Sequence, residues 1–145
     1  MNNKDYYLAC FRSLNTNKIK GNVAPHKPIL LLSVISLFEE GTLTGNQIEL
    51  NEELHNMFNR LWRQYVGKSD WFSPKIATPF WHLQNEPFWQ LVSKTDVPVE
   101  DFHSPYSANK LRENFYAEID AELTALLSDP NFRNAAWQLI VKTYF

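Results

Sequence analysis

The chain has 145 residues, with 44% hydrophobic residues, 21% charged residues and a formal net charge of −2. This composition is ordinary for a globular protein, and the length suits one domain that spans residues 1–145. No apolar run approaches the roughly 20 residues of a membrane-spanning helix, and the N-terminus lacks a secretory signal pattern. We therefore expect a cytoplasmic protein without membrane contacts, and the single Cys10 agrees with a reducing compartment.

The charges are unevenly distributed along the chain. Residues 1–28 carry five basic side chains against Asp5 alone, a net charge of +4. Residues 54–85 carry four basic side chains against Asp70, a net charge of +3. Two such segments would form a basic face that favours an anionic partner, although scatter of this size also arises by chance.

The N-terminal third predicts two helices separated by a polar loop. Apolar residues recur at helical spacing over residues 5–14, and residues 15–22 are rich in turn formers. A second helix is predicted to begin at Pro28, which lacks the amide hydrogen that a first helical residue leaves unpaired, and to end at Gly41. Residues 29–38 are apolar almost all round, so we expect this helix to be central and buried.

The middle of the chain predicts a hairpin, a helix and a loop. Residues 42–50 alternate around a Gly-Asn turn and predict a small β-hairpin. Asn51 is a suitable N-cap for an amphipathic helix that ends near Tyr65. Residues 66–77 follow as a loop that contains a proline.

The pentapeptide Pro-Phe-Trp-x-Leu occurs twice, at residues 79–83 and 87–91. Each proline restricts the residue before it, and the Gln-Asn-Glu between the two apolar runs is a turn candidate. We predict two short strands, 80–83 and 88–92, which form a second hairpin near residues 80–92. Most of the aromatic side chains in this segment are expected in the core.

The C-terminal part predicts a long loop over residues 93–106, then a short helix that Ser107 caps and that ends near Asn114. Further helices are expected over residues 117–127 and from Asp129 onward. These elements predict an α+β, mainly helical fold, with about five to six helices and small antiparallel hairpins.

The sequence lacks the patterns that most enzymes need. None of the four histidines lies at metal-ligand spacing from another histidine or from Cys10, and the four glycines form no phosphate-binding loop. No serine-hydrolase, zinc-protease or redox-cysteine motif occurs. We therefore predict a binding domain without catalytic residues, metal or cofactor.

Two short segments place polar groups beside rigid apolar ones. In the first, Pro25 and Pro28 flank His26 and Lys27 at the start of the buried helix, where anions are favoured. A phosphate oxygen could meet His26 and Lys27 there. The alternative is that Pro28 only starts the helix and Lys27 is solvated.

The second segment is Thr78-Pro79-Phe80-Trp81-His82. As a strand, it would place Phe80 and His82 on one face and Trp81 on the other. Trp81 is expected in the core. Pro79 and His82 fit a binding surface and a half-buried structural position equally well.

Four motifs occur in order along residues 5–145, namely P-H-K-P-I-L-L-L, P-F-W-H-L-Q-N-E-P-F-W-Q-L, S-A-N-K-L-R-E-N and a final helix ending in Y-F. This order resembles the DNA phosphorothioate sulfur-binding domain, the N-terminal domain of HNH-type modification-dependent restriction endonucleases. The resemblance implies binding to double-stranded DNA in which sulfur replaces one non-bridging phosphate oxygen. Because the chain ends where an HNH domain would begin, we expect the recognition domain alone, with an HNH nuclease in cis or in trans.

The resemblance also implies where the sulfur would bind. Sulfur is larger, softer and a poorer hydrogen-bond acceptor than oxygen, so a small apolar cup suits it, while nearby cations hold the phosphodiester charge. By position in the family's motifs, the cup corresponds to Thr78, Pro79 and His82. The cationic partners correspond to His26 and Lys27.

A second group of contacts is implied by the loop before the L-R-E helix, which reads bases in the family. Candidate base or backbone contacts here are His103, Ser104, Tyr106, Asn109 and Lys110. The chain departs from the family's pattern at Thr78, where an aromatic residue is expected, and at Lys27, where arginine would make two bonds. A module for unmodified or otherwise modified duplex DNA, and a protein-interaction domain, therefore stay as alternative functions.

Overall fold

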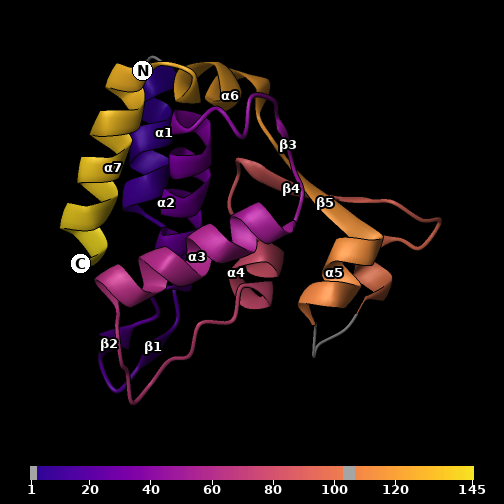
Figure 1. The fold of residues 1–145 in the computed structure, drawn as a ribbon, viewed down its shortest axis with the longest axis horizontal. Helices are drawn as coiled ribbons and strands as arrows, with labels where there is room; N and C mark the ends of the chain where they lie inside the picture. The colour runs from indigo at the N-terminus through magenta and orange to yellow at the C-terminus, as the bar shows by residue number, and fades with distance from the viewer. Residues whose placement is uncertain (1–2, 103–106) are drawn as a thin grey trace.

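The computed structural model describes residues 3–102 and 107–145 (Figure 1). The fold is α+β and mainly helical, as predicted, and the described residues form seven α-helices where five to six were expected. No helix in this part of the chain has the length and apolar character to cross a membrane. The helices are α1 (Asn3–Arg12), α2 (His26–Glu39), α3 (Glu52–Tyr65), α4 (Ala77–His82), α5 (Ala108–Asn114), α6 (Ala121–Leu127) and α7 (Pro130–Tyr144).

Helix α2 lies at the centre of the helical layer because it is apolar almost all round. Every residue from Lys27 to Phe38 except Ser36 is buried, as the sequence predicts. The hydroxyl of Ser33 donates a hydrogen bond to the Ile29 carbonyl at 2.7 Å, so this buried polar group is paired. Helices α3, α4 and α7 contact α2, and Figure 1 shows α1 and α7 running alongside it.

The start of α2 differs from the prediction. The helix begins at His26, and Pro28 is its third residue rather than its first. The amides of the first helical turn have no intrahelical partner, so proline is tolerated at the third position as well as at the first. At the other end, Gly41 follows the helix with a φ of +79°, the conformation of a C-terminal glycine cap.

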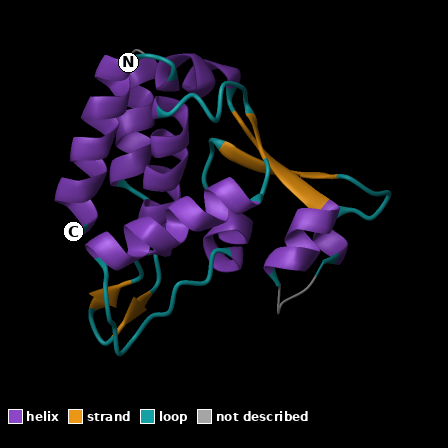
Figure 2. Cartoon of the chain, in the orientation of Figure 1, coloured by secondary structure: helices purple, strands orange, loops and turns teal. Residues whose placement is uncertain are grey.

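Three strands form one antiparallel sheet in the order β3-β5-β4 (Figure 2). They are β3 (Gln47–Ile48), β4 (Trp89–Ser93) and β5 (Phe115–Ile119). Ala117 in the middle of β5 is paired with Ile48 on one side and with Leu91 on the other. The predicted hairpin over 42–50 is therefore wrong, because β3 pairs with a strand far along the chain. The helix predicted over 117–127 is also wrong at its start, where β5 precedes α6.

The two copies of Pro-Phe-Trp-x-Leu adopt different structures. Residues 79–83 lie in α4 and the 3₁₀ turn η1 (Leu83–Asn85), whereas the second copy enters β4. The predicted strand over 80–83 and the hairpin near 80–92 are therefore wrong. The second copy has β5 as its partner strand, and the first has no strand pairing among the described residues. Pro79 fits the first turn of a helix, where a missing amide hydrogen costs little.

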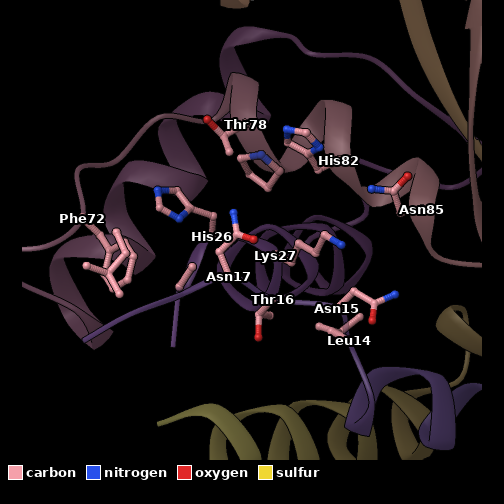
Figure 3. A pocket seen from close by; sticks show the side chains of 13 residues that line it. Leu14, Asn15, Thr16, Asn17, His26, Lys27, Phe72, Thr78, His82 and Asn85 are labelled. Atoms are coloured by element: carbon pink, nitrogen blue, oxygen red, sulfur yellow. The ribbon is translucent and has the colours of Figure 1, made fainter. Parts of the chain in front are cut away.

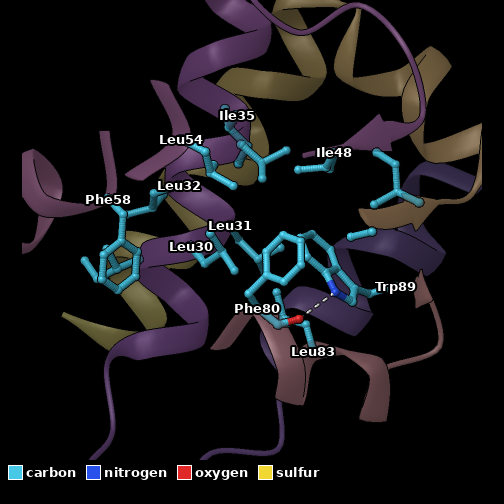
Figure 4. Close-up of a cluster of buried hydrophobic side chains, with 14 of the residues drawn as sticks. Leu30, Leu31, Leu32, Ile35, Ile48, Leu54, Phe58, Phe80, Leu83 and Trp89 are labelled. Atoms are coloured by element: carbon cyan, nitrogen blue, oxygen red, sulfur yellow. Dashed lines mark hydrogen bonds between the residues drawn. The ribbon is translucent and has the colours of Figure 1, made fainter. Parts of the chain in front are cut away.

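The aromatic residues of both copies are buried, as predicted for most of them. Phe80 and Phe88 are fully buried, and Trp81 and Trp89 are buried at 8% and 1% exposure. The Trp89 indole donates a hydrogen bond to the Phe80 carbonyl at 3.1 Å, which is the dashed line in Figure 4. The two rings also meet edge to face, with centroids 5.6 Å apart. The two copies are thus directly packed together in the core.

A second, smaller sheet interrupts the loop predicted over 15–22. Strands β1 (Lys18–Ile19) and β2 (Asn22–Val23) are antiparallel and are joined by Lys20 and Gly21. Both linking residues have positive φ, +49° and +83°, as a two-residue type I′ turn requires. This hairpin and the loop between α3 and α4 lie together at the lower edge of Figure 1.

Candidate nucleic-acid interface

An open cleft of about 510 Å³ lies between the start of α2, the face of α4 and the segments around β1 (Figure 3). All five residues predicted to hold the modified phosphate, His26, Lys27, Thr78, Pro79 and His82, line it. The other lining residues are Leu14, Asn15, Thr16, Asn17, Ile19, Ala24, Phe72 and Asn85. We call it the α2–α4 cleft.

One wall of the cleft is the outer face of α4. Residues three and four apart lie on one face of a helix, so Thr78, Pro79 and His82 face the cleft together. Phe80 and Trp81 turn toward the core. A strand would have separated Pro79 from His82, so the helical structure of this segment is what brings the three cleft residues to one surface.

His26 stands at the junction of the cleft and the loop between α3 and α4. Its Nε2–H donates to the Ser73 carbonyl at 2.8 Å, which leaves Nδ1 without the proton in the neutral ring. The ring lies 4.8 Å from the Trp62 ring and 5.9 Å from the Phe72 ring, centroid to centroid. Burial among these rings lowers the pKa of His26, and the bond to Ser73 opposes that shift. His26 therefore favours its neutral form.

Lys27 is buried, with 7% exposure, although it lines the cleft. Its Nζ lies 2.8 Å from Oε2 of Glu86, which is also buried, at 6% exposure. The same carboxylate oxygen accepts the backbone N–H of Asn15 at 3.2 Å. Lys27 is thus neither solvated nor a lone cation, because a buried carboxylate compensates its charge.

Sequence reasoning did not identify Glu86. The residue lies between two apolar runs in a segment that predicts a turn, where an acidic side chain is expected to be solvated. Lys27 and Glu86 are separated by 59 positions, and no local pattern predicts that pairing. An acidic residue followed directly by Pro-Phe-Trp is the only signal that could have pointed to burial.

His82 is the most exposed of the predicted residues on the α4 wall. Partial burial, and then the charge of nearby Lys27, lower the pKa of the His82 imidazole. Figure 3 shows His82 and Thr78 on the α4 side and Asn15, Thr16 and Asn17 on the opposite side. The cleft is therefore lined by neutral polar groups and apolar atoms around one compensated lysine.

The opposite wall is fixed by the last helix. The Tyr144 hydroxyl accepts the backbone N–H of Leu14 at 3.0 Å and donates to the Phe11 carbonyl at 2.6 Å. Burial raises the pKa of Tyr144, so the hydroxyl keeps its proton for the second bond. These bonds hold the end of α1 and the start of the segment from Leu14 to Asn17.

Four exposed lysines lie on two segments that also contribute residues to the cleft, the β1–β2 hairpin and the loop between α3 and α4. We call the group formed by Lys18, Lys20, Lys68 and Lys75 the basic rim. Lys20 Nζ lies 5.1 Å from the centroid of the Trp71 ring, which joins the β1–β2 hairpin to the loop between α3 and α4. Within residues 3–102 and 107–145, no carboxylate forms a salt bridge with these four lysines. Their charges are available to an anionic partner.

The second predicted group of contacts is only partly described. His103, Ser104 and Tyr106 lie outside the described residues. Asn109 and Lys110 are exposed on α5, which Ser107 caps as predicted, and they do not line the cleft. Across the described ranges, no three His, Cys, Asp or Glu side chains are grouped so that they could hold a metal ion.

Comparison with known proteins identifies the family. The ScoMcrA-like DNA sulfur-binding domain matches residues 4–145, so the chain belongs to this family, and the resemblance inferred from the motifs is confirmed. One similar solved structure is the sulfur-binding domain of SprMcrA complexed with phosphorothioated DNA. It has 17% sequence identity and a TM-score of 0.71, and the match covers 99% of this chain and 86% of that chain. At this identity the likeness establishes a shared fold. No curated protein matches the chain.

Proposed function

We propose that this sulfur-binding domain binds double-stranded DNA with a phosphorothioate link in its backbone. The observation that carries the proposal is the α2–α4 cleft, which gathers His26, Lys27 and the α4 face into one surface hollow. Family membership supports the same ligand. The similar structure in complex with phosphorothioated DNA supports sulfur-modified DNA as the partner class.

The lining of the cleft suits a sulfur atom. Contact with apolar carbon stabilises bound sulfur more than bound oxygen. Because sulfur is the poorer hydrogen-bond acceptor, a site with few hydrogen-bond donors costs sulfur less binding free energy than it costs oxygen. Pro79, Ala24 and Ile19 supply apolar lining, and Thr78 also lines the cleft, at the position where the family's motif has an aromatic residue. We assign the sulfur cup to Thr78, Pro79 and His82, with His26 and Lys27 near the remaining phosphate oxygens.

The basic rim suits the DNA backbone on either side of the modified link. Lysines on exposed loops neutralise phosphates without regard to sequence, and they release counterions as they do so. The rim therefore supplies affinity, and the cleft supplies selection of the modified link. We also retain base or backbone contacts for His103, Ser104, Tyr106, Asn109 and Lys110.

The biological setting that we propose is a modification-dependent restriction system. In such a system this domain would serve as the recognition module, and an HNH nuclease in cis or in trans would cut. Membership of a DNA sulfur-binding family supports the recognition role in this proposal. Cleavage of phosphorothioate plasmid in a mixture with the native nuclease, and no cleavage by this domain alone, is the expected result.

The direct test compares three duplexes of one sequence, with an Rp phosphorothioate link, an Sp link or a plain phosphate, by fluorescence anisotropy. We expect the Rp duplex to bind at least about tenfold more tightly than the plain duplex, a difference of about 1.4 kcal/mol. Equal binding to all three with a steep salt dependence would instead identify a module for unmodified duplex. No binding to any duplex would favour a protein-interaction domain.

A further inference from the structure

The Lys27–Glu86 pair is an unusual feature for a site that binds an anion. Both side chains are buried, and their charged atoms are 2.8 Å apart. Removing two charges from water is expensive, and a buried pair is often no more stable than two apolar residues. Stability alone therefore does not account for a carboxylate behind the lysine of this cleft.

The pair determines the charge that a ligand meets in the cleft. Lys27 contributes one positive charge and Glu86 one negative charge. Among the residues that the structure describes, the only other titratable side chains that line the cleft are His26 and His82, and both have a lowered pKa. The floor of the cleft thus has little net charge at neutral pH, whereas the basic rim outside it is cationic.

Charge compensation affects plain and modified phosphate differently. Both diesters carry one negative charge, so long-range attraction to the basic rim does not distinguish them. A free ammonium group in the cleft would strengthen oxygen binding more, because oxygen is the better hydrogen-bond acceptor. An ammonium group that is already bonded to Glu86 attracts a phosphate oxygen less strongly. The apolar contacts that favour sulfur do not depend on this ammonium group and are unaffected.

We propose that Glu86 is a specificity-determining residue, which acts through Lys27 to keep the cleft floor neutral and so lowers affinity for plain phosphate more than for phosphorothioate. The inference rests on the proposed function. Glu86 is a positioning residue rather than a direct ligand, and its bond to Asn15 also holds the wall opposite α4. The two roles are separable, because glutamine keeps an acceptor for Asn15 but carries no charge.

The test measures affinity of the whole domain for the Rp-phosphorothioate duplex and for the plain duplex. For Glu86→Gln we expect plain-duplex affinity to rise, and the ratio of modified to plain affinity to fall by roughly fivefold or more. The dependence of log Kobs on log[salt] for the plain duplex should steepen by up to about 0.9, as one more phosphate contact would give. A ratio within twofold of wild type would overturn the proposal.

A matched control is the exposed Glu49–Lys94 pair, 2.6 Å apart, which lies outside the cleft. Glu49→Gln makes the same change in net charge and is expected to leave the ratio unchanged. An equal fall in the ratio for both variants would mean that net charge alone is responsible, which contradicts a specific role for Glu86.

Two further measurements keep the inference testable. If Glu86→Gln does not fold, the double variant Lys27→Met/Glu86→Gln removes both charges of the pair. Because Lys27 is a proposed phosphate contact, we expect this variant to bind both duplexes more weakly and by the same factor, so the ratio of modified to plain affinity stays at its wild-type value. Loss of the ratio in a folded double variant would overturn the inference. If the wild-type domain does not distinguish the two duplexes at all, the proposed function fails. A wild-type preference that Glu86→Gln does not reduce refutes only the inference.

Discussion

Two copies of one pentapeptide perform different tasks in this molecule. Pro-Phe-Trp-His-Leu at 79–83 forms a helical wall of the α2–α4 cleft, and Pro-Phe-Trp-Gln-Leu at 87–91 enters an edge strand of the sheet. The aromatic residues are buried in both copies, so burial is common to them. The two copies differ in what pairs with their backbone N–H and C=O groups. Residues 89–93 pair with β5, and residues 77–82 satisfy their own hydrogen bonds as a helix.

The comparison shows that an apolar run specifies burial more strongly than it specifies secondary structure. The two copies contribute differently to the cleft through their prolines and through the fourth residue of the pentapeptide, His82 or Gln90. Pro79 is buried and lines the cleft, whereas Pro87 is exposed and does not. His82 borders the cleft, and Gln90 borders a separate hollow beside Glu118. Paired substitutions at equivalent positions can therefore separate packing from binding.

The largest expected effect should be the same in both copies. Phe80→Ala and Phe88→Ala each remove a fully buried ring, and we expect each to lower the free energy of unfolding by about 3–5 kcal/mol. Urea unfolding followed by tryptophan fluorescence measures both values. A loss below about 1 kcal/mol in either variant would contradict the equal burial of the two rings.

The second effect should appear in one copy only. Pro79→Ala removes ring carbons from the proposed sulfur cup, and a loss of two buried methylenes predicts roughly tenfold weaker binding of the Rp-phosphorothioate duplex. Pro87→Ala is the matched control, because Pro87 is exposed and outside the cleft. Fluorescence anisotropy with circular dichroism as a folding check tests the pair. Equal weakening by both variants would refute a specific role for Pro79.

The smallest effect concerns pH. Because the pKa of His82 is lowered in the free domain, the imidazole is neutral at pH 7 and gains a proton as the pH falls. A bound polyanion favours the protonated ring, so DNA affinity should rise on acidification. Between pH 7.5 and pH 5.5, the increase in DNA affinity should be about threefold smaller for His82→Gln than for the wild-type domain. The increase that remains in the variant should come from protonation of His26.

Gln90→His provides the reciprocal substitution. A histidine at that position titrates beside Glu118 and away from the cleft, so it should leave the pH profile of DNA binding unchanged. A restored pH dependence in the double variant His82→Gln/Gln90→His would show that any nearby surface histidine suffices.

The elements predicted correctly are those that local sequence determines. Asn51 accepts the Leu54 N–H at 3.0 Å, and Ser107 accepts the Lys110 N–H at 3.1 Å, so both predicted helix caps are confirmed. The elements predicted wrongly depend on distant partners. Phe115 to Ile119 alternate strictly between buried and half-buried positions, yet the sequence contains no sign that β3 and β4 pair with that segment.

The candidate site shows the same division. The motifs pointed to His26, Lys27, Thr78, Pro79 and His82, and these residues line one cleft although two distant segments supply them. Their roles toward DNA stay predictions. The carboxylate that compensates Lys27 could not be predicted, because the two residues lie 59 positions apart and only the tertiary fold brings them together.

The bonds of Tyr144 give the cleft a mechanical connection to the end of α7. The hydroxyl joins that helix to Phe11 and Leu14, 133 and 130 positions away, and Leu14 is the first residue of the cleft wall opposite α4. A displacement of the last helical turn would therefore move that wall relative to α4. Such a coupling is reciprocal, so a ligand that fixes the width of the cleft would also restrain the position of α7.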